Sequence, residues 1–553
     1  MRYLRLLPGG AATPFAALLV ALCVMAPVAT LLWHALHGSF EHWAHLAQYV
    51  LPVALRNTAL LLAGVGVLVS CLGVGSAWLV TAYDFPTRRV LSWALLLPLA
   101  VPTYIIAFAY LDLLHPIGPI QTLVRDILGY DSPRQFRLPD IRSLPGAVFL
   151  LGFVLYPYVY LTTRIMFSSQ AASLLEAGRI LGETRRSVFF RIALPMARPA
   201  IAVGVSLALL ETLNDIGASE FLGVQTLTVS IYTTWVTRSD LAGAAQISLA
   251  MLVLVAGLIL LERHGRRHQR YALTQRSRPL RPQTLSPARS LLAALLGWTP
   301  IVIGFVAPAL YLLNETVKRL GSAGQLSSQL ISSAVNTVSV SLSATLLTIL
   351  CGLLVVWVAR PSRRPSALFG IAARFSTIGY AIPGTVLAIG LLTPFVLVDG
   401  LFNHILSLFS RISPQLWLTG SFTALVIAYA IRFLAISVGG LEAGLARIPP
   451  SLEQSSRLLG ETSAGTLRRV HLPLLRPAIG AAALLVFVDA MKELPATLLL
   501  RPVNFETLAT WLYAEAARGT YEEGAIAALG IVLAGLLPVI LLARTQFSME
   551  KKT

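Results

Sequence analysis

Apolar runs of about 20 residues recur along the whole chain and alternate with short polar segments. An α-helix needs about this length to cross the hydrocarbon core of a bilayer, whereas a membrane barrel would show short segments of alternating polarity. The pattern predicts an all-α polytopic membrane protein with about 12 transmembrane helices. The predicted spans are 14–36, 57–83, 90–114, 144–167, 199–222, 241–262, 290–313, 336–358, 367–397, 418–441, 478–500 and 524–543.

One polar, Arg-rich segment occurs twice, at 173–201 and 451–479, and the two copies align without a gap. Both contain R-x-L-G-E-T and then [IV]-x-L-P-x-x-R-P-A-I. Other landmarks recur at a nearly constant offset: Asn57-Thr58 with Asn336-Thr337, Trp78 with Trp357, and Pro102 with Pro383. With about six spans per half, the repeat predicts two parallel halves related by a pseudo-twofold axis along the membrane normal.

This repeat defines the expected domains. The first half occupies 1–262 with a core at about 57–262, and a basic cytoplasmic linker follows at 263–289. The second half occupies 290–553 with a core at about 336–543.

Each repeated segment has helical spacing up to a glycine, Gly182 in one copy and Gly460 in the other. Glycine adopts positive φ without steric cost, so it can end one short helix and let the chain turn into a second. Pro195 and Pro473 follow, and proline suits the start of a helix better than its middle. We therefore expect a helix–turn–helix elbow on the membrane surface. The alternative is a solvated loop whose Arg residues only set topology, but a fixed spacing and a second copy favour docking of a partner.

The elbow resembles the E-A-A-x-x-x-G-x(9)-I-x-L-P loop of ABC importer permeases. The first copy matches it at Glu176, Ala177, Gly182, Ile192, Leu194 and Pro195, with Gly178 in place of the second Ala. The second copy keeps Gly460, Leu472 and Pro473, has Val470 for the Ile, and replaces E-A-A by Gln454, Ser455 and Ser456. The resemblance implies that each loop couples to a groove of an ATPase subunit, through Glu176, Ala177, Gly182, Glu183, Pro195, Gln454, Gly460, Glu461 and Pro473.

Acidic residues lie in the apolar span after each elbow. The repeat pairs Glu211 with Asp489 and Asp215 with Glu493, and the two acids of each copy share a helical face. Charges in hydrocarbon are costly, so we expect these acids to line a substrate path and to contact a hard cation transiently, without a fixed metal site. The aligned helix breakers Gly217 and Pro495 support this interpretation. The alternative is an ion-pair network with Lys492, Arg374 and Arg432.

The charge distribution refines the picture. The chain of 553 residues is 56% hydrophobic and 12% charged, with a net charge of +18. Its Arg residues cluster in alternate loops, which predicts membrane orientation with both termini in the cytoplasm and argues against nucleic-acid binding. No G-x-x-x-x-G-K-[ST] motif is present, so we expect no enzymatic activity, no cofactor in this chain and no ATP hydrolysis by it.

Two stretches, Met491 to Thr510 (MKELPATLLLRPVNFETLAT) and ETLNDIGASEFLGVQTLTVSIYTTW in the first half, resemble ferric-iron ABC importer permeases. The resemblance implies a type I importer fold in the bacterial inner membrane. It also implies two copies of a cytoplasmic ABC ATPase, which bind ATP and Mg, and a periplasmic substrate-binding protein. Thiamine or polyamine permeases remain alternatives for the substrate, and an ATP-independent secondary carrier is the remote alternative.

Overall fold

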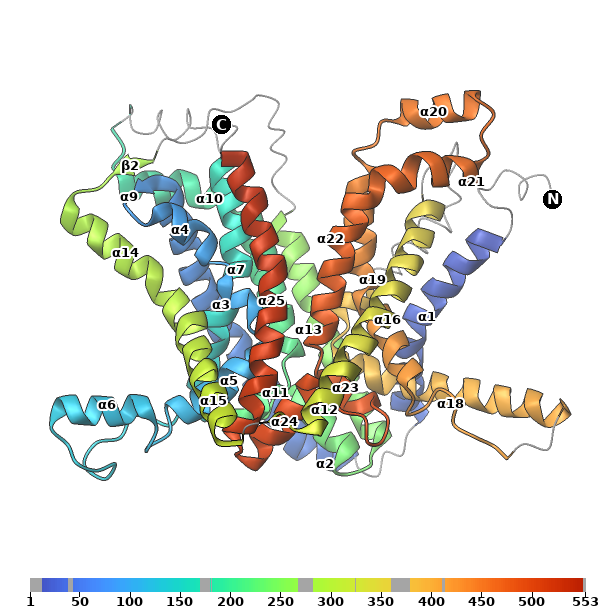
Figure 1. Cartoon of the computed structure of the whole chain (residues 1–553), viewed down its shortest axis with the longest axis horizontal. Coiled ribbons are helices and arrows are strands. Elements are labelled where there is room, and N and C mark those ends of the chain that lie inside the picture. Colours follow the sequence, from blue (N-terminus) through green and yellow to red (C-terminus); the bar gives the residue numbers. More distant parts are fainter. Residues whose placement is uncertain are drawn as a thin grey trace. The chain divides into compact units, whose positions relative to one another are not determined.

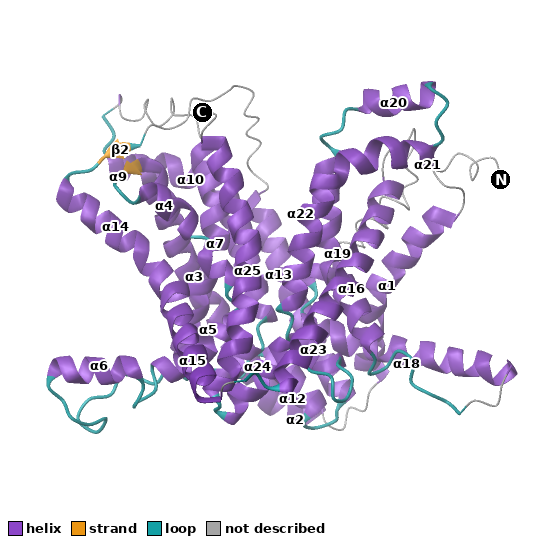
Figure 2. Ribbon diagram, viewed as in Figure 1, coloured by secondary structure: helices purple, strands orange, loops and turns teal. Residues whose placement is uncertain are grey.

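The computed structural model describes residues 12–37, 43–169, 180, 182–266, 282–323, 325–359, 378–409 and 413–550 (Figure 1). Helices dominate these segments, and one pair of short strands accompanies them (Figure 2). Eleven of the described helices are long and apolar enough to cross a membrane. The number is up to twelve if the pair Arg88–Ala100 and Thr103–Leu113, bent by 91°, is one span. The expected all-α polytopic fold is therefore confirmed.

The chain forms two compact units, each built from several segments. The α3 unit contains His45–Ser230, Ala250–Leu326 and Leu512–Thr553, and the α16 unit contains Met1–Ala44, Ile231–Leu249 and Ser327–Trp511. Each unit therefore takes helices from both sequence halves. The predicted boundaries at 262 and 290 describe the repeat along the chain and stay a prediction.

The α3 unit contains most helices of the first half of the sequence, together with helices from later segments. They are η2 (Leu46–Val50), α3 (Leu51–Ala82), α4 (Arg88–Ala94), η3 (Leu97–Ala100), α5 (Thr103–Leu113), α6 (Pro119–Leu128), α7 (Leu144–Ser169), α9 (Arg185–Val188), η4 (Phe189–Ala193), α10 (Leu194–Asn214), α11 (Gly217–Phe221), α14 (Pro287–Ile301), η5 (Val302–Val306), α15 (Ala307–Ala323) and α25 (Tyr521–Glu550). Strand β1 (Tyr83–Asp84) pairs in parallel with β2 (Gln283–Thr284).

The α16 unit repeats this plan. Its helices are α1 (Ala12–His37), α16 (Ser328–Ala359), η6 (Ile378–Ala381), α18 (Gly384–Phe409), α19 (Phe422–Leu445), α20 (Pro450–Leu458), α21 (Ser463–Thr466), η7 (Leu467–His471), α22 (Leu472–Met491) and α23 (Pro495–Leu500). Four helices contain or adjoin a boundary between the units: α2 (Trp43–His45), α12 (Leu227–Val236), α13 (Leu241–Arg266) and α24 (Leu508–Arg518).

The core of each unit is the same helix pair. Helix α3 packs along α7, and α16 packs along α19. A glycine occupies the same place in both pairs: a Cβ on Gly73 would lie 2.6 Å from Val159 Cβ, and one on Gly352 would lie 2.2 Å from Ser437 Oγ. Small residues let membrane helices approach closely, because dispersion contacts rather than water exclusion hold them together.

In each unit, a helix from one end of the sequence packs on the other helices. In the α16 unit, α1 packs on α18 and α16; in the α3 unit, α25 packs on α15 and η3. Within the α3 unit, α9 and the strands lie at one end and α6 at the other (Figure 1). Within the α16 unit, α20 and α21 lie at the end where α22 begins, and α18 extends from the opposite end (Figure 1). Each unit therefore has an elbow end and an opposite end.

Candidate functional site

From Gly182 and Gly460 onward, the two elbows have the same backbone and the same ion pair. Gly182 and Gly460 both have φ of +86°, so the predicted positive-φ turn is confirmed in both copies. Directly after the glycine, Glu183 pairs with Arg191 at 2.9 Å. The matching residues Glu461 and Arg469 pair in the second copy. The carboxylate thus connects the turn to the helix that enters the membrane.

These ion pairs are exposed to solvent, so they add little stability. Hydrogen bonds from Ser187 and Arg191 nevertheless hold the pKa of Glu183 below its ordinary value. The carboxylate therefore remains charged at neutral pH and available to a partner.

The elbows present apolar side chains to the outside. Ile180 is 85% exposed in the first copy, and the matching Leu458 is 88% exposed in the second. In the second copy, Ser456 is buried and its hydroxyl lies 3.0 Å from that of Thr466, which joins α20 to α21. Polar groups therefore hold the elbow together internally, while branched aliphatic side chains point away from it.

The remaining predicted elbow residues fall in three groups. Gln454 and Pro473 are exposed, and Pro195 is half-buried. Glu176 and Ala177 lie outside the described residues. Their predicted contact with an ATPase stays a prediction.

The prolines follow a wide helical turn, which refines the prediction that they start a helix. The helical segments Arg186–Asn214 and Ala464–Met491 already contain Pro195 and Pro473. A π-helical turn precedes each proline, and the N–H of Leu194 bonds to the carbonyl of Phe189. In the second copy, the N–H of Leu472 bonds to the carbonyl of Leu467. The wide turn lets the helix continue where proline has no N–H to donate.

Beyond each elbow, the spanning helix breaks at the predicted acid. In the α3 unit, α10 ends at Asn214 and α11 begins at Gly217. Asp215, only 6% exposed, accepts hydrogen bonds from the backbone N–H of Ala218 at 3.3 Å and of Ser219 at 2.8 Å. Its other partners are the hydroxyls of Thr103, at 2.6 Å, and Ser219, at 3.1 Å. Asp215 therefore caps α11 in an environment of neutral donors.

The second break has the same cap and a different partner. In the α16 unit, α22 ends at Met491 and α23 begins at Pro495. The Glu493 carboxylate accepts the N–H of Ala496 at 3.0 Å, as Asp215 accepts that of Ala218. Its other partner is the guanidinium of Arg432 on α19, also at 3.0 Å, and both side chains are buried.

Gly384 makes room for this arginine. A Cβ at Gly384 would lie 1.9 Å from Arg432 Nη1 and 2.8 Å from Glu493 Oε1. The residue in the same position of the repeat is Thr103, which follows Pro102 as Gly384 follows Pro383. The first copy therefore satisfies its carboxylate with a threonine hydroxyl, whereas the second removes that side chain and brings in a guanidinium.

The other two predicted acids are less buried. Glu211 and Asp489 are partly exposed, and Asp489 pairs with Lys492 at 2.8 Å. The ion-pair alternative thus describes both acids of the second copy, while Arg374 lies outside the described residues. Among the residues that the structure describes, no group of three or more His, Cys, Asp or Glu side chains could hold a metal ion. The role of the four acids in a substrate path stays a prediction.

The repeated Asn-Thr landmarks hold the segment after each break. Asn57 donates to the Gln225 carbonyl at 3.1 Å, and Thr58 accepts the N–H of Leu227 at 3.0 Å. In the second copy, Asn336 donates to the Glu506 carbonyl at 3.0 Å. The hydroxyl of Thr337 accepts the N–H of Leu508 at 2.8 Å. Asn57 and Thr58 therefore connect α3 to the start of α12. Asn336 and Thr337 connect α16 to the start of α24 in the same way.

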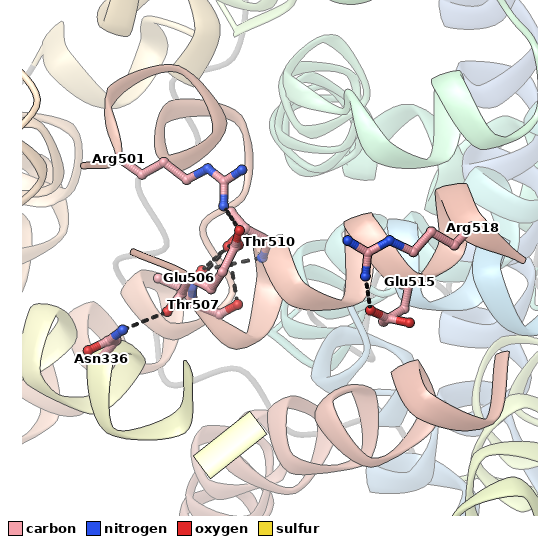
Figure 3. Close-up of polar contacts among 7 residues, drawn as sticks. All are labelled: Asn336, Arg501, Glu506, Thr507, Thr510, Glu515 and Arg518. Carbon is pink, nitrogen blue, oxygen red and sulfur yellow. Dashed lines mark hydrogen bonds and ion pairs between the residues drawn. The ribbon is translucent and has the colours of Figure 1, made fainter. Parts of the chain in front are cut away.

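The second of these segments carries additional charges. Arg501 pairs with Glu506, whose carboxylate also accepts the hydroxyl of Thr510 at 2.6 Å (Figure 3). In the α3 unit, Tyr513 donates to Glu220 of α11 at 2.5 Å. Sequence reasoning assigned no role to Glu220, Thr103 or Gly384, although the aligned Pro102 and Pro383 mark the position of the last two.

Known proteins resemble this chain over most of its length. The model of the family described as "Binding-protein-dependent transport system inner membrane component" matches residues 70–270 and 349–551. The chain is 26% identical over 497 residues to the Fe(3+)-transport system permease protein FbpB 2 of Haemophilus influenzae, covering 89% of this chain and 90% of that protein.

Two further relatives cover different shares of the chain. A probable ABC transporter permease protein, y4fN of Sinorhizobium fredii, is 24% identical over 521 residues, covering 89% of this chain and 87% of that protein. The molybdenum transport system permease protein ModB of Escherichia coli is 29% identical over 188 residues, covering 33% of this chain and 79% of that protein.

Proposed function

Because this chain belongs to the family of inner membrane components of binding-protein-dependent transport systems, we propose that it forms the translocation path of an ATP-driven importer for ferric iron. The observation that carries the proposal is the similarity to an Fe(3+)-transport permease over 89% of this chain. That similarity includes both copies of the elbow, so one chain supplies both docking positions of the importer.

The elbows are the sites at which two copies of a cytoplasmic ABC ATPase bind. The exposed Ile180 and Leu458 provide the apolar contact, and Glu183 and Glu461 hold the turn behind it. ATP and Mg belong to the ATPase, and this chain transmits its closure as a movement of the elbow. The contacts of the elbow must differ between the open and closed ATPase, because otherwise ATP could not shift the equilibrium.

Charge supports the orientation that this function requires. In the second copy, Arg447, Arg457, Arg468 and Arg469 lie in or beside the elbow, which puts this end in the cytoplasm by the positive-inside rule. A periplasmic binding protein then delivers substrate at the opposite end of each unit. The same rule places both chain termini in the cytoplasm.

The acids at the helix breaks support a cationic substrate, because carboxylate oxygens are hard ligands that suit Fe³⁺. Glu211 and Asp489 are partly exposed, so these are the acids that a passing ion can contact. Asp215 and Glu493 are buried and hold the break. Thiamine or polyamines are the alternatives among cationic substrates. The pairing of Glu493 with Arg432 and of Asp489 with Lys492 neutralises both acids of the second copy and favours one further candidate, an anionic substrate.

Uptake into proteoliposomes tests the proposal. The vesicles contain this chain, its ATPase and its binding protein, and ATP is enclosed with the ATPase. We expect ATP-dependent accumulation of radioactive iron that excess unlabelled iron competes away, while thiamine, spermidine and molybdate leave it unchanged. Accumulation of one of those competitors in place of iron would contradict the assignment of iron as the substrate. Iron uptake without ATP would contradict the proposal of an ATP-driven importer.

A second experiment tests the elbows. Gly182→Pro and Gly460→Pro remove the positive φ that both turns require. We expect normal abundance in the membrane but ATP hydrolysis without uptake. Full coupling in both variants would contradict the docking role.

A further inference from the structure

Helix α6 buries two of its polar side chains and exposes an apolar stripe. Gln121 and Arg125 are buried, whereas Leu123, Ile127 and Leu128 are 60%, 74% and 53% exposed. With Ile120 and Val124, which are half-buried, these residues form a stripe at helical spacing. A water-facing helix would show the opposite arrangement, so the medium beside this stripe must be apolar.

The buried polar residues tie α6 to the helix before it. Gln121 donates to the carbonyl of Leu114 at 2.7 Å, and Arg125 donates to the carbonyl of Pro116 at 2.8 Å. The side-chain oxygen of Gln121 also accepts the N–H of Leu138 from the returning loop at 3.0 Å. Helix α6 is therefore held firmly at the end of α5, with its apolar stripe directed outwards.

The α16 unit builds the same arrangement with different residues. In the outer part of α18, Asp399 is buried and accepts the N–H groups of Trp417, Leu418 and Thr419 in the returning loop. Asn403 binds the backbone of Gln415 in the same loop through both its oxygen and its nitrogen. The exposed side chains of this part are mainly apolar: Leu397, Leu401, Phe402, Ile405, Leu408 and Phe409.

The position of both helices identifies the apolar medium. In its own unit, each extends sideways from the bundle at the end opposite the elbow (Figure 1). The spanning helices of each unit end at this level (Figure 1), so we infer that it is the level of the lipid headgroups. Partly exposed aromatic residues accompany both helices, Tyr130 after α6 and Trp417 beside α18, as is typical of the membrane interface.

We propose that α6 and the outer part of α18 are interfacial anchors that lie in the outer leaflet of the membrane, with their apolar stripes against the acyl chains. Amphipathic helices bind in this way when the buried apolar area compensates for ordering at the surface. The surface is therefore a lipid-binding site, and its partner is the bilayer rather than the substrate-binding protein.

The anchors have a mechanical consequence, because a short loop, 114–118, joins α6 to α5, and the outer part of α18 belongs to the helix that begins beside the second break. Helix α5 begins at Thr103, which donates to Asp215, and α18 begins at Gly384, which adjoins Arg432 and Glu493. Fixing the outer end at the headgroup level therefore fixes the depth of the break. This part of the proposal holds for any substrate of the importer.

Depth-dependent fluorescence quenching tests the proposal in the assembled transporter. Cys23, Cys71 and Cys351 are first replaced by serine, and single cysteines at Leu123, Ile127 or Leu401 are labelled with bimane in proteoliposomes. Matched controls carry the label at Asp126, which is exposed beside the stripe of α6, and at Ser407, which is exposed on the polar side of α18. We expect stripe positions to be quenched strongly by lipids brominated near the headgroup and weakly by aqueous iodide, with the reverse at the controls.

Two outcomes would overturn the anchor. Equal iodide quenching at stripe and control positions would place the stripe in water. Protection of the stripe by saturating binding protein, without any effect of brominated lipid, would assign the surface to that protein.

A functional measurement adds a second readout. The double variant Leu123→Glu with Ile127→Glu inserts charges into the stripe, whereas Asp126→Glu serves as its matched control. We expect lower uptake for the double variant at equal abundance, together with loss of the brominated-lipid quenching from a bimane at Val124. Retained quenching in the double variant would contradict the burial of this face in lipid.

Discussion

The elbows and the helix breaks are both repeated, but only the described part of the elbows, from Gly182 and Gly460 onward, is repeated in detail. Gly182 and Gly460 have the same φ, and the same Glu–Arg pair follows each. At the breaks, the N–H groups of Ala218 and Ala496 bind the carboxylate in both copies. The second copy, however, has the guanidinium of Arg432 beside Glu493, where the first has the hydroxyl of Thr103 beside Asp215. The proposed docking of two identical ATPase subunits requires two identical surfaces, whereas a buried carboxylate needs only some compatible donor.

The largest expected effect comes from removing the guanidinium of the second break. Arg432→Ala leaves Glu493 buried without its cation, and loss of one partner of a buried ion pair costs about 3–5 kcal/mol. We expect a lower midpoint of thermal unfolding of the purified protein. Adding Glu493→Gln should recover much of this loss, because the amide needs no counter-charge. A midpoint unchanged in Arg432→Ala would show that the pair is not energetically important.

The next effect tests whether the two breaks are interchangeable. Gly384→Thr gives the second break the side chain of the first and places it against Arg432 Nη1. Overpacking of this kind costs about 3 kcal/mol, measured by the same unfolding midpoint. Combining it with Arg432→Val and Glu493→Asp, which introduce the residue types of Val154 and Asp215 in the first copy, should recover stability. If the triple variant unfolds at the same midpoint as Gly384→Thr alone, residues other than these three determine how the two breaks differ.

A smaller effect is expected at the first break. Thr103→Val removes the hydroxyl that donates to Asp215 but leaves the bonds from Ala218 and Ser219. Loss of one hydrogen bond to a charged group costs about 2 kcal/mol. Thr103→Ser retains the hydroxyl and is the matched control in the thermal unfolding measurement. A larger loss of stability in Thr103→Val than in Arg432→Ala would contradict the expected order of the two effects.

The smallest effect should be equal in the two elbows. Gly182→Ala and Gly460→Ala meet no neighbouring atom and only strain the positive φ, at about 1 kcal/mol each. This strain should weaken binding of the ATPase about fivefold in each variant, as measured by titration of the purified proteins. Unequal effects would show that the elbows are not equivalent in use, although their geometry is.

The sequence by itself determined the features that depend on local rules. Run length and polarity predicted the spanning helices, because hydrocarbon must be crossed by about 20 apolar residues. The repeat with its fixed glycines predicted the positive-φ turns at Gly182 and Gly460, since few other residues adopt that conformation. Aligned breakers predicted the interruptions near Gly217 and Pro495, where α11 and α23 begin.

Only the tertiary structure decided which distant side chains meet. Nothing in the spacing indicated that Thr103 binds Asp215, or that Gly384 makes room for Arg432 beside Glu493. The sequence also did not indicate that α1 belongs to the α16 unit and α25 to the α3 unit. It did not indicate either that α6 directs an apolar stripe outwards. Apolar residues look alike in a sequence whether they face protein or lipid, and a buried charge finds its partner through packing rather than through its neighbours along the chain.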